Sequence, residues 1–270
     1  MRNHLVTSKQ PLLNIDGTLR EPGWSTSLVQ TYNRRDIKKR VTRIKEWDYY
    51  SVISNKNNIA VCFTVSDLGY IELDSVSFID FSVPREHTQG NILPFPLGRL
   101  HMPSDSSIGD VKISNSKLGL EFLVKDEKRI IRCDFPEFDG GKGLKANITL
   151  ESLDDDTMVI ATPFKTDKKA FYYNQKINCM RACGKVMYDG KLYEFSPETD
   201  FGGLDWGRGV WTYDNIWYWG SGSGEVDGHR FGFNIGYGFG DTSAASENVI
   251  FYDGKAHKID DVKFNIGDNY

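Results

Sequence analysis

The sequence predicts an all-β protein built from antiparallel strands, and three observations support this class. Aromatic residues make up 13% of the 270 residues, and aromatic side chains favour strands. Short runs rich in Val, Ile, Phe, Tyr and Thr follow one another, with turn signals between them. No run with helical periodicity exceeds about three turns, which excludes an alternating βαβ architecture.

Composition limits the classes of function. The formal net charge is −4, so no overall positive charge attracts nucleic acid or an anionic membrane. No apolar stretch is long enough for a signal peptide or a membrane span. The four cysteines fit reduced thiols better than a disulfide framework. We therefore expect a cytoplasmic protein with no nucleic-acid partner and no integral membrane association.

The N-terminal segment is predicted to be extended and rich in turns. Residues 11–33 contain Asp-Gly and Pro-Gly turn signals, and Trp24 is expected to anchor this segment by packing. A basic run follows, in which Ile37, Val41 and Ile44 fall at helical spacing, so a short amphipathic turn is expected there. The basic side chains of this run fit either a solvated face or a grip on a phosphate or carboxylate group.

From residue 45 onward the chain is predicted to be a meander of strands. The predicted strands before residue 165 cover 46–54, 59–65, 69–83, 111–116, 117–126, 128–136, 144–152 and 157–164. Residues 84–103 carry no strand pattern and predict a lid or a crossing loop. The polar stretch 163–169 predicts a junction between domains 1–165 and 166–270. Asp189-Gly190 and Asp253-Gly254 predict hairpin turns in the second domain.

The stretch 202–248 is the most distinctive part of the chain. It holds four of the six tryptophans, and in its second half bulky apolar residues alternate with glycine and asparagine from Phe231 to Gly240. Successive strand residues face opposite sides, so one face is apolar and the other almost bare. Strand glycine marks a bend, a bulge or a close approach. Either the aromatic residues lie inside a coiled barrel, or the glycines make room for a flat, apolar ligand.

Asp205 is the candidate catalytic residue. A carboxyl group buried among tryptophans would resist ionisation, which suits a proton donor in a dry aromatic pocket. The alternative is that Arg208 pairs with Asp205 or Glu247 as a structural ion pair. Trp211, Tyr213, Trp217 and Trp219 share one strand parity, whereas Trp206 and Arg208 have the other. A glycine must therefore turn the chain if all of them are to border one cavity.

The remaining candidates for ligand binding lie on neighbouring predicted strands and loops. Asp241 and Glu247 follow the glycine-rich strand, where they either position a ligand at a barrel mouth or cap a loop. The full predicted set is Trp206, Arg208, Trp211, Tyr213, Trp217, Trp219, Asn234, Tyr237, Asp241, Glu247 and Tyr173. The glycine motifs lack the strand-to-helix context of phosphate loops. The scattered histidines and the Cys179/Cys183 pair predict no metal site.

Three long segments together resemble a known family. They are PGW with YNRRDIKKRVTRIKEWDYY, then FYYNQKINCMRACG, then LDWGRGVWTYDNIWYWGSGSG with FGFNIGYGFGDTSAASEN. These segments are similar to domain of unknown function 2804, a calycin-like family related to hydroxyneurosporene-synthase-like and lipocalin-like proteins. The resemblance implies two lipocalin-like antiparallel β-barrels or barrel-like sheets. Family members usually continue further, so the second barrel is expected to be incomplete.

The family has no established activity to transfer. Its better-known relatives hydrate or cyclise isoprenoid-like substrates, or carry lipids, without an organic cofactor, and none of their catalytic residues is matched here. We expect binding of a small or medium-sized, largely apolar ligand, with a cofactor-independent hydratase, cyclase or isomerase activity as the enzymatic version. Two alternatives stay open: a carbohydrate-active β-sandwich with tryptophan platforms and a carboxylate pair, or a structural module with no ligand.

Overall fold

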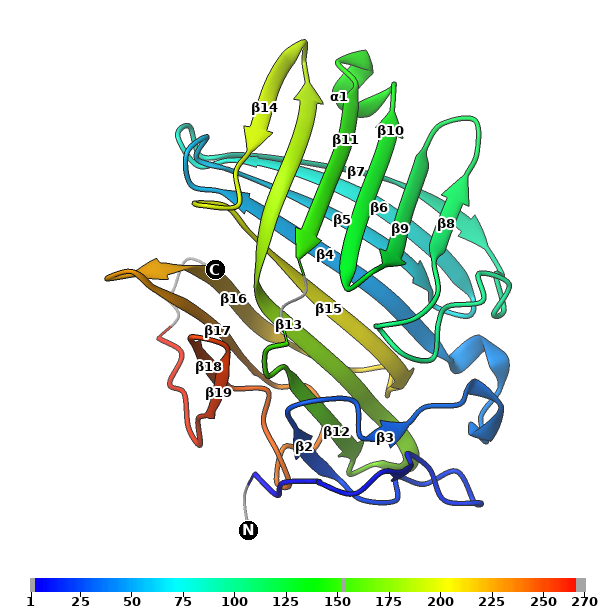
Figure 1. Ribbon diagram of the computed structural model, residues 1–270. Helices are drawn as coiled ribbons and strands as arrows, with labels where there is room; N and C mark the ends of the chain where they lie inside the picture. Colours follow the sequence, from blue (N-terminus) through cyan, green and yellow to red (C-terminus); the bar gives the residue numbers. More distant parts are fainter. Residues whose placement is uncertain (1–2, 152–153, 266–270) are drawn as a thin grey trace.

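The protein is almost entirely β in the computed structural model, which describes residues 3–151 and 154–265 (Figure 1). The helical elements in these ranges are α1 (Phe138–Gly141) and two 3-10 turns (Arg34–Asp36 and Val41–Arg43). The prediction of an all-β protein is confirmed. Ile37 and Ile44 of the expected amphipathic turn are buried, whereas Val41 is exposed.

The largest sheet holds thirteen strands and follows the order β7-β6-β5-β4-β15-β13-β11-β10-β9-β8, with β2, β12 and β14 paired to its members. The first half contains β4 (Lys45–Ser54), β5 (Ile59–Asp67), β6 (Ile71–Asp80), β7 (Arg85–Pro94) and β15 (Phe201–Val210). The second half contains β8 (Val111–Ser114), β9 (Gly119–Lys125), β10 (Lys128–Phe135), β11 (Leu144–Glu151) and β13 (Asp167–Tyr188). The added strands are β2 (Gly23–Ser25), β12 (Met158–Phe164) and β14 (Lys191–Phe195).

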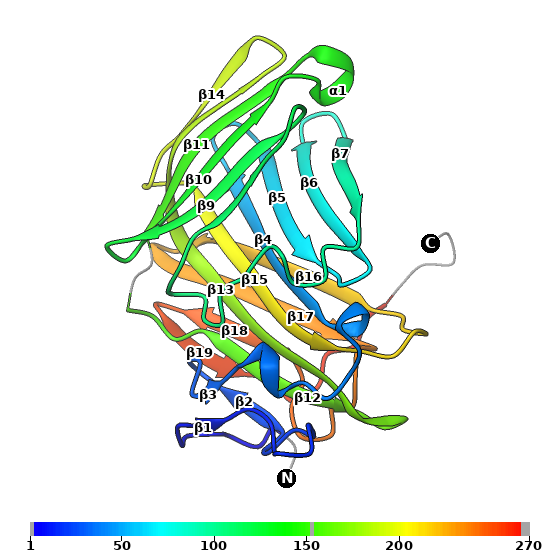
Figure 2. The same ribbon diagram turned by 90° about the vertical axis from the view of Figure 1, so that its right-hand side faces the viewer.

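This sheet curls into a half-barrel, so that β4–β7 face β8–β11 across the main core (Figure 2). The inward residues come from alternate positions of each strand, as the strand period requires. Phe63, Leu120 and Ile148 are among the inward side chains with no exposed surface. The interior of this half-barrel is therefore filled by side chains.

A second, four-stranded sheet packs against the outer face of β13. It follows the order β16 (Tyr218–Val226), β17 (His229–Tyr237), β18 (Val249–Tyr252) and β19 (Lys255–Lys258). A smaller core that includes Met158, Tyr172 and Phe251 lies between the two sheets. The molecule thus has two sheets, of which the larger is a curled half-barrel, and β13 belongs to the boundary between them. Figure 1 shows β16–β19 beside the lower half of β13.

The N-terminal segment adds short pieces of strand around this lower half. Strands β1 (Gln10–Pro11) and β3 (Gln30–Thr31) pair in parallel, and β2 pairs with β12. Trp24 packs against the smaller core, and its indole N–H donates to the backbone oxygen of Asn3 at 3.1 Å. The expected anchoring role of Trp24 agrees with these contacts.

Two expectations about individual elements were wrong. Residues 84–103 are not a single loop, because β7 occupies their first half as an edge strand. Its half-buried residues are His87, Gln89 and Asn91, which are polar, so the sequence lacks the apolar alternation that marks a half-buried strand. The interpretation that put the bulky residues of β17 inside a coiled barrel does not hold, because Phe231, Phe233 and Ile235 are half-exposed. Gly232, Asn234 and Gly236 form the buried face instead.

The glycines of β17 are explained by close approach of other elements rather than by a ligand. A Cβ on Gly232 would lie 2.5 Å from the sulfur of Cys179, and one on Gly236 would lie 2.4 Å from a carboxylate oxygen of Glu247. Both distances are shorter than van der Waals contact allows. The bare face therefore lets β17 lie directly on β13.

Two further expectations concern the ends of the predicted domains. The predicted junction at 163–169 is the hairpin turn between β12 and β13, where Phe164 is opposite Asp167. The division into 1–165 and 166–270 stays a prediction. The outer strands of the second sheet, within the described ranges, are β16 and β19. The predicted incompleteness of that sheet depends on the chain end, and residues 266–270 lie outside the described residues.

Candidate functional site

A buried cluster of charged residues lies where the two sheets meet. In the ladder between β13 and β15, Lys176 is directly opposite Asp205, and directly opposed residues of antiparallel strands point to the same face. That face is the outer face of the large sheet, which β17 covers. Glu247 reaches the same place from the loop that precedes β18.

The three side chains form one ion-pair cluster. The Lys176 ammonium pairs with a carboxylate oxygen of Asp205, and it lies 3.6 Å from Oε2 of Glu247. The side chains are 2%, 6% and 5% exposed for Lys176, Asp205 and Glu247 respectively. Formal charges sum to −1, since one cation meets two carboxylates. Burying such charges is costly, so this cluster needs strong local partners.

Those partners are N–H groups from surrounding side chains. Asp205 accepts hydrogen bonds from the Asn174 amide at 2.6 Å and from the Trp47 indole at 3.2 Å. Glu247 accepts one from the Trp217 indole at 3.0 Å and a longer one from Asn234 at 3.3 Å. Because all of these groups donate, the geometry suits ionised carboxylates as acceptors.

Aromatic rings enclose the cluster. The Lys176 ammonium lies 4.8 Å from the ring centroid of Trp219 and 5.3 Å from that of Trp217, within range of cation–π attraction. Tyr172 stacks on Trp47 at 5.7 Å and meets Trp217 edge-on at 6.1 Å. The cluster is therefore surrounded by low-dielectric walls that strengthen its electrostatic interactions.

Tyr172 supplies a hydroxyl group that the protein itself does not use. The Tyr172 side chain has no exposed surface, and its hydroxyl oxygen has no hydrogen-bond partner among the described residues. Burial, followed by the negative charges of Asp205 and Glu247, raises the pKa of Tyr172 well above its usual value. The group therefore stays a phenol, which can donate a hydrogen bond to a ligand oxygen.

The free space beside this cluster is small. The hollow bordered by Lys176, Asp205, Tyr49 and Trp219 has a volume of about 10 Å³, roughly enough for a single water molecule. A larger ligand requires a wall to move. Trp217 is the most exposed of these walls, with 36% of its surface exposed, and it is the last residue of a stretch with no regular secondary structure, residues 211–217.

The structure brings five of the residues predicted from sequence to this cluster. They are Asp205, Trp217, Trp219, Asn234 and Glu247. The side-chain amide of Asn234 donates a hydrogen bond to the Glu247 backbone oxygen and accepts one from the Trp219 indole. Trp211 lies at the edge, where its ring meets Trp47 at 5.3 Å. The alternative pairing of Arg208 with Asp205 or Glu247 was wrong, since Lys176 pairs with both carboxylates.

Three other predicted residues lie on the opposite face of the large sheet. Strand β15 is unbroken from Phe201 to Val210, so no glycine turns Trp206 and Arg208 towards Asp205. Arg208 pairs with Asp48 at 3.0 Å inside the half-barrel, and the Tyr173 hydroxyl donates to the Gln30 backbone. The expected arrangement of one cavity bordered by Trp206 with Arg208 at its polar end is therefore not the one found.

The last three predicted residues lie near the surface. Tyr213 is 86% exposed and Tyr237 is 44% exposed. Asp241 accepts a hydrogen bond from the Ser243 backbone at 3.1 Å, and Lys165 lies 3.7 Å away. This arrangement is a loop cap, which was the alternative role considered for Asp241.

Sequence reasoning named Asn174 and Lys176 only as possible ligand contacts beside Tyr173, and it did not place them or Tyr172 at the centre of a cluster. Lys176, Tyr172 and Asn174 share one parity along β13 and face the second sheet, whereas Tyr173 faces the half-barrel. The signal that could have found them is the pairing of β13 with β15, which puts Lys176 opposite Asp205. Trp47 was read only as part of a strand. It reaches the cluster because Gly207, its cross-strand neighbour, leaves room for the indole.

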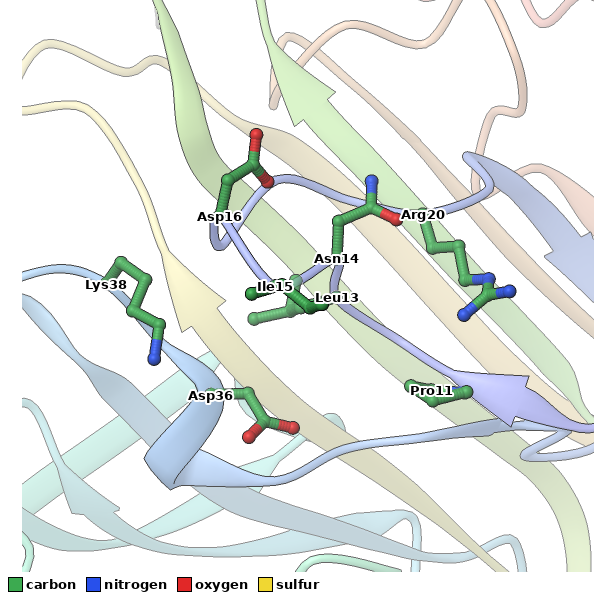
Figure 3. A pocket seen from close by; sticks show the side chains of 8 residues that line it. All are labelled: Pro11, Leu13, Asn14, Ile15, Asp16, Arg20, Asp36 and Lys38. Atoms are coloured by element: carbon green, nitrogen blue, oxygen red, sulfur yellow. The ribbon is translucent and has the colours of Figure 1, made fainter.

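A separate hollow on the N-terminal segment has a volume of about 730 Å³ and is lined by residues of 11–38 (Figure 3). Its charged side chains carry both signs, Arg20 and Lys38 against Asp16 and Asp36. Ile15 at its rim is 97% exposed. This hollow is an open surface feature, and the described residues hold no cluster of His, Cys, Asp and Glu suited to a metal ion. No described helix is long and apolar enough to cross a membrane.

The curled half-barrel, the four-stranded sheet and the cluster between them define a calycin-like β-barrel protein. The chain belongs to the family described as domain of unknown function (DUF2804), whose model matches residues 3–270. No curated protein matches the sequence significantly. Solved structures show the fold. An AttH protein from Nitrosomonas europaea aligns with a TM-score of 0.51 at 12% identity, over 80% of this chain and 67% of that chain.

Two further solved structures are similar. CghA aligns with a TM-score of 0.51 at 12% identity, over 95% of this chain and 68% of its own. Kievitone hydratase from Nectria haematococca aligns with a TM-score of 0.42 at 9% identity, over 93% of this chain and 73% of its own. At these identities the alignments with the AttH protein and CghA support the fold and nothing finer.

Proposed function

We propose that this protein binds a small or medium-sized, largely apolar molecule against the cluster of Lys176, Asp205 and Glu247. The observation that carries this proposal is a buried ion cluster enclosed by aromatic rings, beside a phenol with no partner of its own. Buried titratable groups in such surroundings are typical of functional sites. The four cysteines are free, which supports a cytoplasmic location.

We further propose a cofactor-independent hydratase, cyclase or isomerase activity for this site. The Tyr172 hydroxyl and the Lys176 ammonium are the available proton or hydrogen-bond donors, and the carboxylates of Asp205 and Glu247 are the available acceptors. Protein donors and acceptors that contact the same ligand suit proton transfer to and from its carbon atoms. The resemblance to hydroxyneurosporene-synthase-like proteins supports this class. The carbohydrate-active alternative is not favoured, because both carboxylates are buried and bound to the same lysine.

A ligand enters this site by displacing Trp217. The Trp217 indole covers Lys176, yet more than a third of the residue is exposed. Moving it would open the space above Lys176 while the walls of Trp47 and Tyr172 stay in the core between the sheets. The polar end of the ligand would then accept a hydrogen bond from the Tyr172 hydroxyl, and the displaced Trp217 ring would pack on the ligand.

The test uses a fluorescent apolar probe, N-phenyl-1-naphthylamine, and native mass spectrometry of the freshly purified protein to detect a bound lipid or terpenoid. Trp217→Leu should weaken binding of the probe by about tenfold, because it removes an aromatic wall, and Tyr172→Phe should weaken binding of a copurifying molecule with an oxygen acceptor by about tenfold. The matched control is Phe233→Leu, which changes an aromatic residue on the exposed face of the same second sheet. If Phe233→Leu abolishes probe binding and Trp217→Leu does not, the apolar site lies elsewhere.

A further inference from the structure

Another hollow, with a volume of about 280 Å³, lies beside Trp211. It is formed by the segment that leads into β4, by the turn before β6 and by the residues after β15. Trp211 connects it to the cluster, since Trp211 lines this hollow and also packs against Trp47. The lining residues are Thr42, Arg43, Lys45, Tyr70, Trp211, Thr212 and Tyr213.

Two cations and three aromatic rings face this space. The Arg43 guanidinium carbon lies 3.7 Å from the ring centroid of Tyr213, and the Lys45 ammonium lies 4.1 Å from that of Tyr70. Each cation donates one hydrogen bond to a backbone oxygen. Arg43 donates to that of Trp211, and Lys45 donates to that of Leu68. An arginine carries five N–H donors and a lysine three, so most of their donors stay available.

The positive charge in this hollow is not neutralised by an ion pair. Among the described residues, no carboxylate pairs with Arg43 or Lys45. Asp67 acts on Lys45 from a distance, but its oxygens accept the backbone N–H groups of Gly69 and Gly98. Asp167, on which the Arg43 charge also acts, is paired with Lys39. An electropositive space with aromatic walls therefore remains.

We propose that this hollow is a separate binding site for a small planar aromatic anion. The ring of the ligand would pack against Tyr70, Trp211 and Tyr213, and its negative group would accept hydrogen bonds from Arg43 and Lys45. Charge-assisted hydrogen bonds of this kind are stronger than neutral ones. The volume is just under the range of roughly 300–1,000 Å³ for drug-sized ligands, so a molecule of one or two rings fits. This inference does not depend on the proposed function.

The test is isothermal titration of the whole chain with 2-naphthoate and with its neutral isostere, 2-naphthamide. We expect naphthoate to bind at least about tenfold more tightly than naphthamide, and added salt to weaken naphthoate alone. Arg43→Gln and Lys45→Met should each remove most of this preference for the anion. The matched control is Arg40→Gln, which removes the same charge from an exposed position of the same basic run and should change nothing.

Further variants keep the outcome decisive. Tyr213→Leu changes a largely exposed ring, so it should fold normally and weaken binding of both naphthalenes severalfold. Lys185→Met, which changes an exposed lysine on β13, should leave naphthoate binding intact. Equal affinity for naphthoate and naphthamide, no binding of either, or an equal loss in Arg40→Gln and Arg43→Gln would each overturn the proposal.

Discussion

At the scale of single residues, Lys176 is the group on which the cluster depends. Among the described residues it is the cation that contacts both Asp205 and Glu247, and each carboxylate is buried. Removing one partner of a buried pair leaves an uncompensated charge in a dry environment. Lys176 therefore has a structural role whatever chemistry it performs, and a variant must be judged on stability as well as on binding.

We predict that Lys176→Met lowers the free energy of unfolding by about 3–5 kcal/mol, because two buried carboxylates then lose their cation. Denaturant unfolding followed by tryptophan fluorescence measures this change. The matched control is Lys185→Met on the same strand, where the lysine is exposed and pairs with exposed Glu194; it should cost less than about 1 kcal/mol. Equal effects of the two variants would contradict the account of a buried cluster.

A second residue-scale prediction concerns Asp74, which is buried inside the half-barrel on β6. Burial, followed by the neighbouring Glu72 carboxylate, raises the pKa of Asp74 to about 8. Between about pH 4 and pH 8, the Asp74 carboxyl group therefore stays protonated in the folded state, whereas it is ionised in the unfolded state. The free energy of unfolding consequently falls as the pH rises through this window.

Asp74→Asn removes this titration and keeps a similar shape. We expect the variant to be more stable than the parent by about 1–3 kcal/mol at pH 9, and its stability to depend less on pH between 5 and 8. Urea unfolding at a series of pH values measures both effects. Asp80→Asn, at the exposed end of the same strand, should leave the slope unchanged. A variant with the parent's slope would show that Asp74 is ionised throughout.

At the scale of elements, β17 shows why a face can be misassigned from sequence. The alternation of bulky and small residues was correctly read as a strand, but bulk was taken to mean burial. The small face is the buried one because β13 and the Glu247 side chain need the space. Tyr172 and Tyr173 are neighbours on β13, so their side chains point to opposite faces of the large sheet. The sequence prediction selected Tyr173, which lies inside the half-barrel, instead of Tyr172, which lies at the site.

Glycine substitutions test this account of β17. Gly236→Ala should lower the free energy of unfolding by about 1–3 kcal/mol and weaken ligand binding, because the new methyl group displaces the Glu247 carboxylate from Lys176 and Trp217. Gly224→Ala, on the adjacent strand β16, is the control: a Cβ there has no neighbour within 4 Å. It should be neutral or slightly stabilising. Thermal unfolding of both variants gives the comparison, and equal effects would refute the account.

At the scale of the whole molecule, local patterns predicted the class and part of the connectivity. The Asp189-Gly190 and Asp253-Gly254 turns join β13 to β14 and β18 to β19, as expected. Strand β15 pairs with β4, however, which lies roughly 150 residues earlier in the chain. No local signal specifies such a pairing, because its register depends on burial across the whole sheet.

The candidate site has the same limit. Asp205, Trp217, Trp219 and Glu247 were selected from one aromatic-rich stretch, and they do lie together. Lys176 comes from a strand some 30 residues earlier, and only the register between β13 and β15 reveals it. When a site forms where two sheets meet, local sequence patterns therefore predict the residues of one contributing segment but not those of the other.

The bulge in β13 makes this contact between sheets possible. The register with β15 shifts between Ile177 and Met180, and Cys179 has a positive φ of 61°. The irregularity presents the Asn178 amide to the second sheet, where it donates to the Gly222 backbone at 3.1 Å and to the Phe233 backbone at 3.2 Å. Asn178 thus bridges β16 and β17 to the large sheet beside Lys176.

We predict that Asn178→Ala lowers the free energy of unfolding by about 1–3 kcal/mol, since it leaves buried backbone acceptors without their donor. Hydrogen exchange should show faster exchange in β16–β19, while the amides of β4, β5 and β11 keep their protection, because the bridge serves only the second sheet. Asn147→Ala, on the exposed side of β11, is the control and should alter neither measurement. Faster exchange spread evenly over both sheets would instead show that the two sheets unfold as one unit and that Asn178 is not a specific bridge between them.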